Sequence, residues 1–122
     1  MPNVVKLLDE DIIYVEKVGR QTEETMFQLA GQINQLVAEL REREQPVLIL
    51  SNTEQESIMD EKTIAMATKI GTDMDYDKSA TYGASAGLHK QREQIAEEAD
   101  LHSKVANFAT REEAIDWLLA KT

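Results

Sequence analysis

The sequence contains no cysteine. This absence excludes disulfides, thiolate metal sites, cysteine nucleophiles and iron–sulfur clusters. Aromatic residues make up only 5% of the 122 residues, so a core must be mainly aliphatic. No apolar stretch approaches the length of a bilayer span, and no basic start precedes an apolar segment. We therefore predict a cytoplasmic protein without stable membrane insertion.

Basic residues are also few. The chain has 13 Lys and Arg against 23 Asp and Glu, which gives a formal net charge of −10. The electrostatic field of this negative charge repels phosphate backbones and anionic membrane surfaces, so we predict no nucleic-acid partner. Hydrophobic residues nevertheless make up 42% of the sequence. Length and composition together predict one folded domain over residues 1–122.

The first half of the chain predicts a hairpin, a long helix and a buried strand. β-Branched segments at 4–8 and 12–18 flank a short acidic turn, which is typical of a β-hairpin. Thr22 is the predicted N-cap of a helix whose apolar positions recur with helical spacing as far as Leu40. Thr25 stands where a full capping box has Glu or Gln. The apolar run 47–50 predicts a central parallel strand, followed by a polar loop over 52–56.

The second half alternates helices and strands. We predict helices at about 59–70 and 88–99, strands at 80–84 and 103–108, and a last helix capped by Thr110 with Glu113. Gly71 is the predicted end of the first of these helices. The order β-β-α-β-α-β-α-β-α predicts an α/β fold. Its sheet is mixed and mainly parallel, opened by a hairpin and flanked by four helices.

No catalytic residue, metal site or cofactor is predicted, and we do not expect an enzyme. No Gly-x-Ser-x-Gly motif is present, and His89 and His102 are predicted to be surface residues. Asp73, Asp75 and Asp77 alternate like the opening of a calcium-binding loop. The positions where that loop needs Gly and Glu hold Lys and Ala, which indicates a solvated acidic loop instead.

Candidate binding residues follow two strands that would be neighbours in such a sheet. Ligands of open α/β sheets bind beyond the carboxyl ends of the strands. The turn 83–87 consists of small residues before a helix, where backbone amides can bind an anion. The basic residues His89, Lys90 and Arg92 follow it directly. Ordinary turn and capping chemistry is the alternative explanation of these residues. The candidates are Ser51, Asn52, Thr53, Ser57, Tyr82, Ser85, Gly87, His89 and Lys90.

Three segments resemble a known family. They are Pro46-Val47-Leu48-Ile49-Leu50-Ser51, Ala80-Thr81-Tyr82-Gly83, and Ala106-Asn107-Phe108 leading through Glu113-Ala114 to Asp116-Trp117-Leu118. Over about residues 12–120 the chain resembles the stage II sporulation protein AA-like (SpoIIAA-like) proteins. These belong to the broad STAS (sulfate transporter and anti-sigma factor antagonist) group with its SEC14-related neighbours. The resemblance implies a mixed sheet of four or five strands and a non-enzymatic interaction module. It also implies that nucleotides or apolar molecules are ligands of some members.

The chain departs from that family at its regulatory serine. Anti-sigma factor antagonists are phosphorylated within an Asp-Ser-Ser-Gly-like stretch at the start of the second helix. Here Ser57 lies near that position, but the segment Glu56–Asp60 contains no Ser-Gly pair. The resemblance therefore does not carry the phosphorylation switch over to this chain.

Two functional hypotheses follow. The first is a regulatory module that recognises a protein partner, or a second copy of itself, through the second helix and the loop 51–57. The second is a carrier or sensor of a small molecule in a strand-end crevice lined by Ser51, Thr53, Tyr82 and Ser85. The SEC14-related side of the resemblance favours an apolar ligand. The basic residues after the turn 83–87 favour an anionic one.

Overall fold

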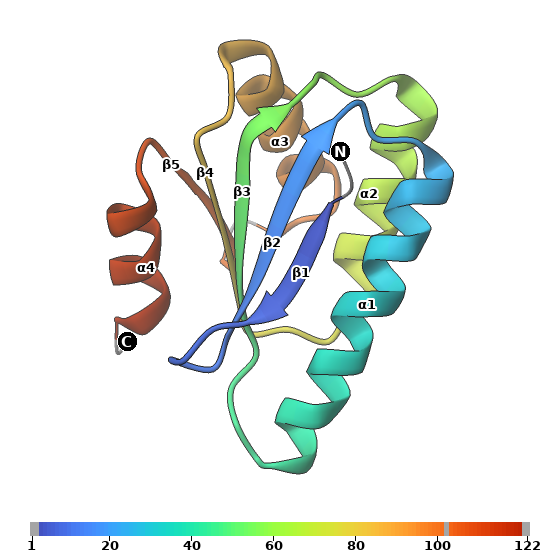
Figure 1. The fold of residues 1–122 in the computed structure, drawn as a ribbon. Helices are drawn as coiled ribbons and strands as arrows, with labels where there is room; N and C mark the ends of the chain where they lie inside the picture. Colours follow the sequence, from blue (N-terminus) through green and yellow to red (C-terminus); the bar gives the residue numbers. More distant parts are fainter. Residues whose placement is uncertain (1–2, 102, 121–122) are drawn as a thin grey trace.

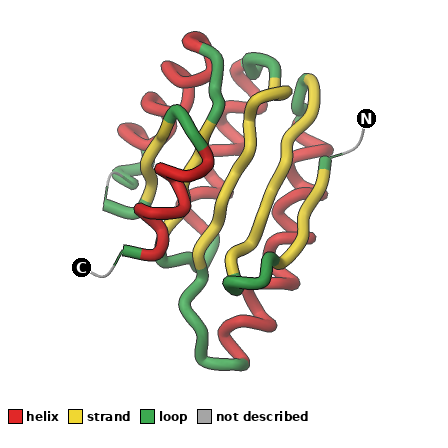
Figure 2. The backbone as a smooth tube through the Cα atoms, turned by 60° about the vertical axis from the view of Figure 1, so that its left-hand side comes forward, coloured by secondary structure: helices red, strands yellow, loops and turns green. Residues whose placement is uncertain are grey.

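A five-stranded mixed sheet forms the centre of the structure, a computed structural model that describes residues 3–101 and 103–120. The strands lie side by side in the order in which they occur along the chain (Figures 1 and 2). β1 runs antiparallel to β2, and every later pair is parallel. The predicted mixed, mainly parallel sheet with an opening hairpin is therefore confirmed. The elements are β1 (Val4–Leu7), β2 (Ile12–Gly19), α1 (Glu23–Glu42), β3 (Leu48–Glu56), α2 (Glu61–Asp73), β4 (Lys78–Tyr82), α3 (Ala86–Glu98), β5 (Val105–Phe108) and α4 (Arg111–Leu119).

The helices cover the sheet unequally. The three helices that connect parallel strands, α1, α2 and α3, pack on one face, which we call the α1–α3 face. The last helix, α4, packs alone on the opposite face, called the α4 face (Figure 1). Because both faces are covered, β2 has no polar side of the kind a solvated strand shows, and residues 12–15 are all buried.

Two hydrophobic clusters share the sheet. On the α1–α3 face, alternate strand residues pack against the apolar stripe of α1, and on the α4 face their neighbours pack against α4. The first cluster includes Ile13, Val15, Ile49, Met26, Leu29, Ile33, Leu88 and Ile95. The second consists of Ile12, Tyr14, Leu50, Ala80, Tyr82, Ala114 and Leu118. Within the described residues, no helix is long and apolar enough to cross a membrane.

The predicted N-cap residues are confirmed, but both predictions about capping boxes are corrected. Thr22 caps α1, and its hydroxyl oxygen accepts from the Thr25 amide at 3.1 Å. Thr25 also completes a capping box, because its own hydroxyl oxygen accepts from the Thr22 amide at 2.8 Å. A hydroxyl at this position can therefore do the work of the expected Glu or Gln. Thr110 caps α4 as predicted, since its hydroxyl oxygen accepts from the Glu113 amide at 3.3 Å. The predicted capping box is not completed, because the Glu113 carboxylate accepts from the Thr110 hydroxyl, at 3.0 Å, instead of from the Thr110 amide.

Several predicted element ends are wrong. The strand predicted over 80–84 is β4, which ends at Tyr82, and the strand predicted over 103–108 is β5, which begins at Val105. β3 does not give way to a loop at Asn52 but continues to Glu56. The polar residues of this segment pair with β2 as far as Glu56 and with β4 up to Asn52, and these backbone hydrogen bonds outweigh the polarity of the side chains. Gly71 does not end α2, which continues to Asp73. Gly71 lies instead against Leu101, whose Cδ1 would be 3.1 Å from a Cβ at this position.

Candidate functional site

Polar side chains interrupt the apolar layer of the α1–α3 face. On β2, Lys17 follows Ile13 and Val15 on the same side of the strand, and on β3 Ser51 follows Ile49 in the same way. Thr81 lies beside Ser51 on β4. These polar groups lie beneath the helices, since Lys17 is 7% exposed, Ser51 6% and Thr81 3%. A polar strip therefore crosses the sheet where a continuous apolar surface would be expected.

A cavity of about 120 Å³ separates this strip from the helices. Its polar surface comes from Lys17, Ser51, Ser79 and Thr81 on the strands and from Arg92 on α3. Its walls are apolar and include Met26, Leu29, Ile33, Ile70, Ile95 and Leu101. An engineered apolar cavity of about 150 Å³ takes up benzene, so this one, which is somewhat smaller, suits only a small organic molecule.

A β-bulge brings Glu56 to the same side of the sheet. Between the pairs Glu16↔Asn52 and Val18↔Gln55, β3 has one residue more than β2. Strict alternation would place Glu56 with Leu50 and Asn52 on the α4 face. The extra residue reverses that alternation, so Glu56 reaches the α1–α3 face and meets α3.

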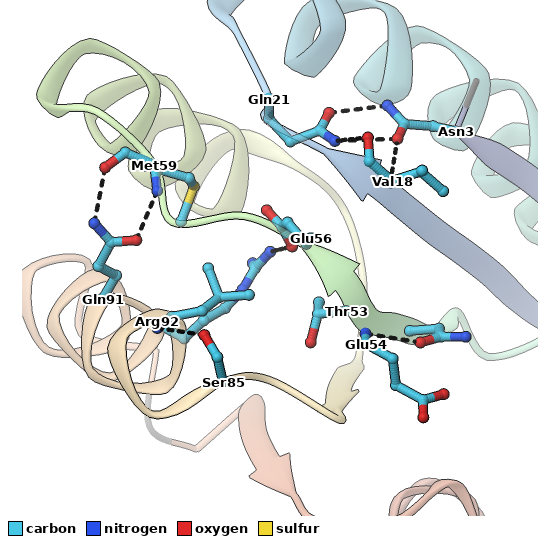
Figure 3. Close-up of polar contacts among 12 residues, drawn as sticks. Asn3, Val18, Gln21, Thr53, Glu54, Glu56, Met59, Ser85, Gln91 and Arg92 are labelled. Carbon is cyan, nitrogen blue, oxygen red and sulfur yellow. Dashed lines mark hydrogen bonds and ion pairs between the residues drawn. The ribbon is translucent and has the colours of Figure 1, made fainter. Parts of the chain in front are cut away.

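Glu56 and Arg92 form a buried ion pair at the edge of the cavity (Figure 3). Arg92 Nη2 donates to Glu56 Oε1 at 2.8 Å, and the Glu56 side chain is 0% exposed. The other carboxylate oxygen, Oε2, and Arg92 Nε are buried without a hydrogen-bond partner in the described part of the chain. The pair is therefore incompletely satisfied, which is costly for buried charged groups.

The Lys17 amine is also unpaired. Its Nζ makes no hydrogen bond or ion pair with any residue that the structure describes. Burial lowers the pKa of Lys17 to about 8, the nearby Arg92 charge lowers it further, and Glu56 opposes both effects. The amine consequently stays mostly protonated at neutral pH. A cationic side chain thus faces a mainly apolar cavity.

The two strands are neighbours as predicted, but Ser51, Asn52 and Thr53 lie within β3 rather than beyond its end, and the predicted residues are divided between the two faces. β3 and β4 are paired neighbours, with Ser51 opposite Thr81 and Asn52 opposite Tyr82. Ser51 lines the cavity, whereas Asn52 and Tyr82 face α4, where Asn52 Nδ2 donates to the Tyr14 hydroxyl at 3.0 Å. The Thr53 hydroxyl donates to the Tyr82 carbonyl at 2.9 Å.

The other candidates lie around the start of α3. Ser85 caps this helix, and its hydroxyl oxygen accepts from the Leu88 amide at 3.3 Å. Gly87, His89 and Lys90 are exposed on α3, and Ser57 is exposed just after β3. The two segments meet, because Ile58 Cγ2 would lie 3.2 Å from a Cβ on Gly87. His102 lies outside the described residues.

Of the three basic residues on α3, only Arg92 turns toward the cavity. The small-residue turn before the helix has a steric explanation. Gly83 has a φ of 78° in the left-handed region, and the Glu54 side chain occupies the space that a Cβ would need. This arrangement agrees with the alternative of ordinary turn chemistry for that segment.

Lys17 and Glu56 were not among the predicted site residues. A usable signal existed for Lys17, since period-two alternation places it on the side of Ile13 and Val15. No such signal existed for Glu56, whose position depends on the bulge. The acidic segment 73–77 has a structural role, because Arg41 donates to Asp75 and Asp77. No group of three or more potential metal ligands occurs in residues 3–101 and 103–120.

Comparison with known proteins assigns the fold. No family model and no curated protein matches the chain. A solved structure of an uncharacterized DUF3478-family protein with a SpoIIAA-like fold, from Shewanella loihica PV-4, matches with a TM-score of 0.68 and 16% identity over 95% of this chain and 91% of that one. The anti-sigma factor antagonist SpoIIAA in its unphosphorylated form matches with a TM-score of 0.62 and 16% identity over 98% of both chains. The chain therefore has the SpoIIAA-like fold that its sequence predicted.

Proposed function

We propose that this protein is a non-enzymatic carrier or sensor that holds a small molecule in the cavity between the sheet and helices α1 to α3. The observation that carries the proposal is the unpaired Lys17 amine in a mainly apolar cavity. Burying a charge without a partner lowers stability, and a ligand that pairs with it would recover part of that cost. The same hypothesis of a carrier or sensor follows from the sequence, but there the binding site is placed at the strand ends and not beneath the helices.

The polar groups of the cavity support binding better than catalysis. Ser51 and Thr81 offer hydroxyls, but in the described chain neither is hydrogen-bonded to a histidine or carboxylate that would activate it. The apolar walls match the usual composition of a ligand pocket, in which a few polar groups fix the orientation of the ligand.

The cavity comes close to the surface between α1 and α2. Ala30, Ile70 and Met74 line both the cavity and a groove on the outside of these two helices. The cavity thus lies one layer of side chains beneath this groove. Phe27 borders the groove and is 70% exposed. We infer that movement of these side chains admits the ligand.

A cavity-filling substitution tests the proposal. Ala67 lines the cavity and is 8% exposed, whereas Ala65 lies on the exposed side of the same helix. A panel of aromatic and aliphatic molecules of about benzene size is screened by chemical-shift changes in the amide NMR spectrum. We expect the shifts to concentrate around Val15, Ser51 and Thr81. Ala67→Leu should abolish them and Ala65→Leu should keep them. A panel that leaves the wild-type spectrum unchanged would contradict the proposal.

A second function, recognition of a protein partner, is favoured by the segment between β3 and α2. Ser57 is exposed there, and Ile58 is 59% exposed, one of few large apolar side chains so placed among the described residues. One protein of this fold is an anti-sigma factor antagonist. The segment is held in place by Gln91, which exchanges two hydrogen bonds of 2.8 Å with the backbone of Met59 (Figure 3).

Pull-down experiments separate this second function from the first. We expect Ile58→Asp to lose a specific partner that the wild type retains. Phe27→Asp, a change at another exposed large apolar residue, on α1, should keep it. If both variants capture the same proteins as the wild type, this segment is not a recognition surface.

A further inference from the structure

The charges beside the cavity do not balance. Lys17 and Arg92 are the charged residues that line it, and Glu56 neutralises one of them through its ion pair with Arg92. Other lining residues are uncharged at neutral pH. The described part of the chain thus leaves one positive charge at the cavity, in a protein whose formal net charge is −10.

The hydrogen-bonding side chains around this charge can all donate to a ligand. The Lys17 amine carries three N–H donors and no acceptor. The hydroxyls of Ser51 and Thr81 line the same cavity, and neither donates a hydrogen bond to another described residue. An anion could accept from all three side chains. Charge-assisted hydrogen bonds of this kind are roughly twice as strong as neutral ones.

We propose that the ligand is a small organic monoanion, a carboxylate on an apolar body, with the Lys17 ammonium as its counter-ion. The inference rests on the proposed function and specifies its ligand. One negative charge neutralises the single positive charge at the cavity, whereas a phosphate monoester dianion would leave a net charge of about −1 there. The apolar walls on α1, α2 and α3 enclose the body of the molecule, with its carboxylate toward the strands. Because a cavity of about 120 Å³ is smaller than one of about 150 Å³ that takes up benzene, a single ring requires the same movement of Ile70 and Met74 that admits the ligand.

The test compares two probes of the same shape. Benzoate and neutral benzyl alcohol are titrated into the wild-type protein at pH 7 and followed by amide NMR shifts. We expect benzoate to bind at least about tenfold more tightly, because removing one partner of a buried charge pair is strongly unfavourable. In Lys17→Met, which keeps the length and apolar volume of the side chain, this preference should disappear. Lys90→Met, a change at an exposed lysine of α3, should leave it intact.

Each outcome separates this inference from the proposed function. Equal binding of both probes to the wild type, or an unchanged preference for benzoate in Lys17→Met, overturns the anion inference but leaves a ligand cavity. Binding of neither probe overturns both. The comparison of probes on the wild type decides the question even if Lys17→Met does not fold. Thr81→Val offers an independent variant in which the charge is retained, and it should weaken benzoate more than benzyl alcohol.

Discussion

At the scale of single residues, Lys17 is the least expected feature of the core. Lysine is rarely buried without a partner, because transfer of its charge out of water is costly. Its position between β2 and the helices is fixed by strand alternation, so the side chain cannot leave the core without a shift of the strand. The protein therefore bears a cost in the free state that either deprotonation or a bound anion would remove.

The pKa of Lys17 predicts an unusual dependence of stability on pH. The pKa is about 8 in the folded protein, against 10.5 for a lysine side chain in water, as in the unfolded chain. Between these values the unfolded chain binds more protons, so the free energy of unfolding rises with pH. We expect an increase of about 2 kcal/mol between pH 7 and 9.5 without added anion, measured by urea unfolding.

Lys17→Met serves as the control for this prediction. It should remove the increase and should also be more stable than the wild type at pH 7, since it buries no charge. Arg92 and Glu56, which face Lys17 from α3 and β3, are present in both proteins, so the comparison isolates Lys17. Burial raises the pKa of Tyr76 and Tyr82, which lowers stability only above about pH 10. A wild type whose stability is flat or falls between pH 7 and 9.5 would show that Lys17 titrates normally.

At the scale of elements, a single carboxylate sets where β4 begins. Asp77 accepts from the Val47 amide at 2.8 Å and from Arg41 at 3.1 Å, while its own amide donates to the Val47 carbonyl at 2.9 Å. Burial alone would raise the pKa of the Asp77 carboxyl, but the hydrogen bonds from Val47 and Arg41 hold it below its ordinary value. The start of β3, the end of α1 and the start of β4 are thus joined at one residue.

Asp77→Ala should consequently destabilise the protein far more than Asp75→Ala. The first leaves the Val47 amide, in a residue that is 0% exposed, without its acceptor, at a cost of about 1–3 kcal/mol. The second removes only a contact between Arg41 and a carboxylate that is 71% exposed, which is worth about 1 kcal/mol or less. Thermal unfolding of both variants measures the difference. Equal losses would mean that the ion pairs, rather than the backbone hydrogen bond, hold the junction.

The elements themselves could be predicted from the sequence to a large extent. Helical spacing from Met26 to Leu40 and the alternation of strands and helices depend on local patterns, and these patterns reflect burial. The site could be predicted only in part. Ser51 was predicted because it follows the apolar run 47–50, but it lies within β3, and it was expected beside Tyr82, which faces the other side of the sheet. The bulge that redirects Glu56 depends on pairing with a distant strand and leaves no mark in the local sequence.

At the scale of the whole molecule, two hydrophobic clusters depend on one sheet. The α1–α3 face carries the cavity and most of the helical packing, whereas α4 alone covers the opposite face. Residues such as Ile12 and Ile13 are adjacent in the chain but belong to different clusters. Loss of either cluster would expose one face of the central strands. We therefore predict that both clusters unfold together, as one cooperative unit.

Two spectroscopic signals can follow the two faces separately. The single tryptophan, Trp117, lies on α4 with its ring 5.8 Å from that of Phe108, so its fluorescence reports the α4 face. Far-UV circular dichroism is dominated by the longer helices of the other face. We expect both urea transitions to coincide in the wild type, as two-state unfolding requires.

A pair of matched substitutions on α4 tests this expectation, because α4 packs on one face of the sheet only. Leu118→Ala, at a residue that is 2% exposed, should lower the free energy of unfolding by about 2–5 kcal/mol, and by the same amount from either signal. Leu119→Ala, at a residue that is 49% exposed, should change the free energy of unfolding from either signal by no more than about 0.5 kcal/mol. Saturating benzoate should move the midpoints of both urea transitions to higher urea concentration in each protein. A ligand of the folded state stabilises every part that unfolds together with its site. If fluorescence changes before circular dichroism, or responds to benzoate differently, α4 is a separately folding attachment rather than part of the unit that contains the cavity.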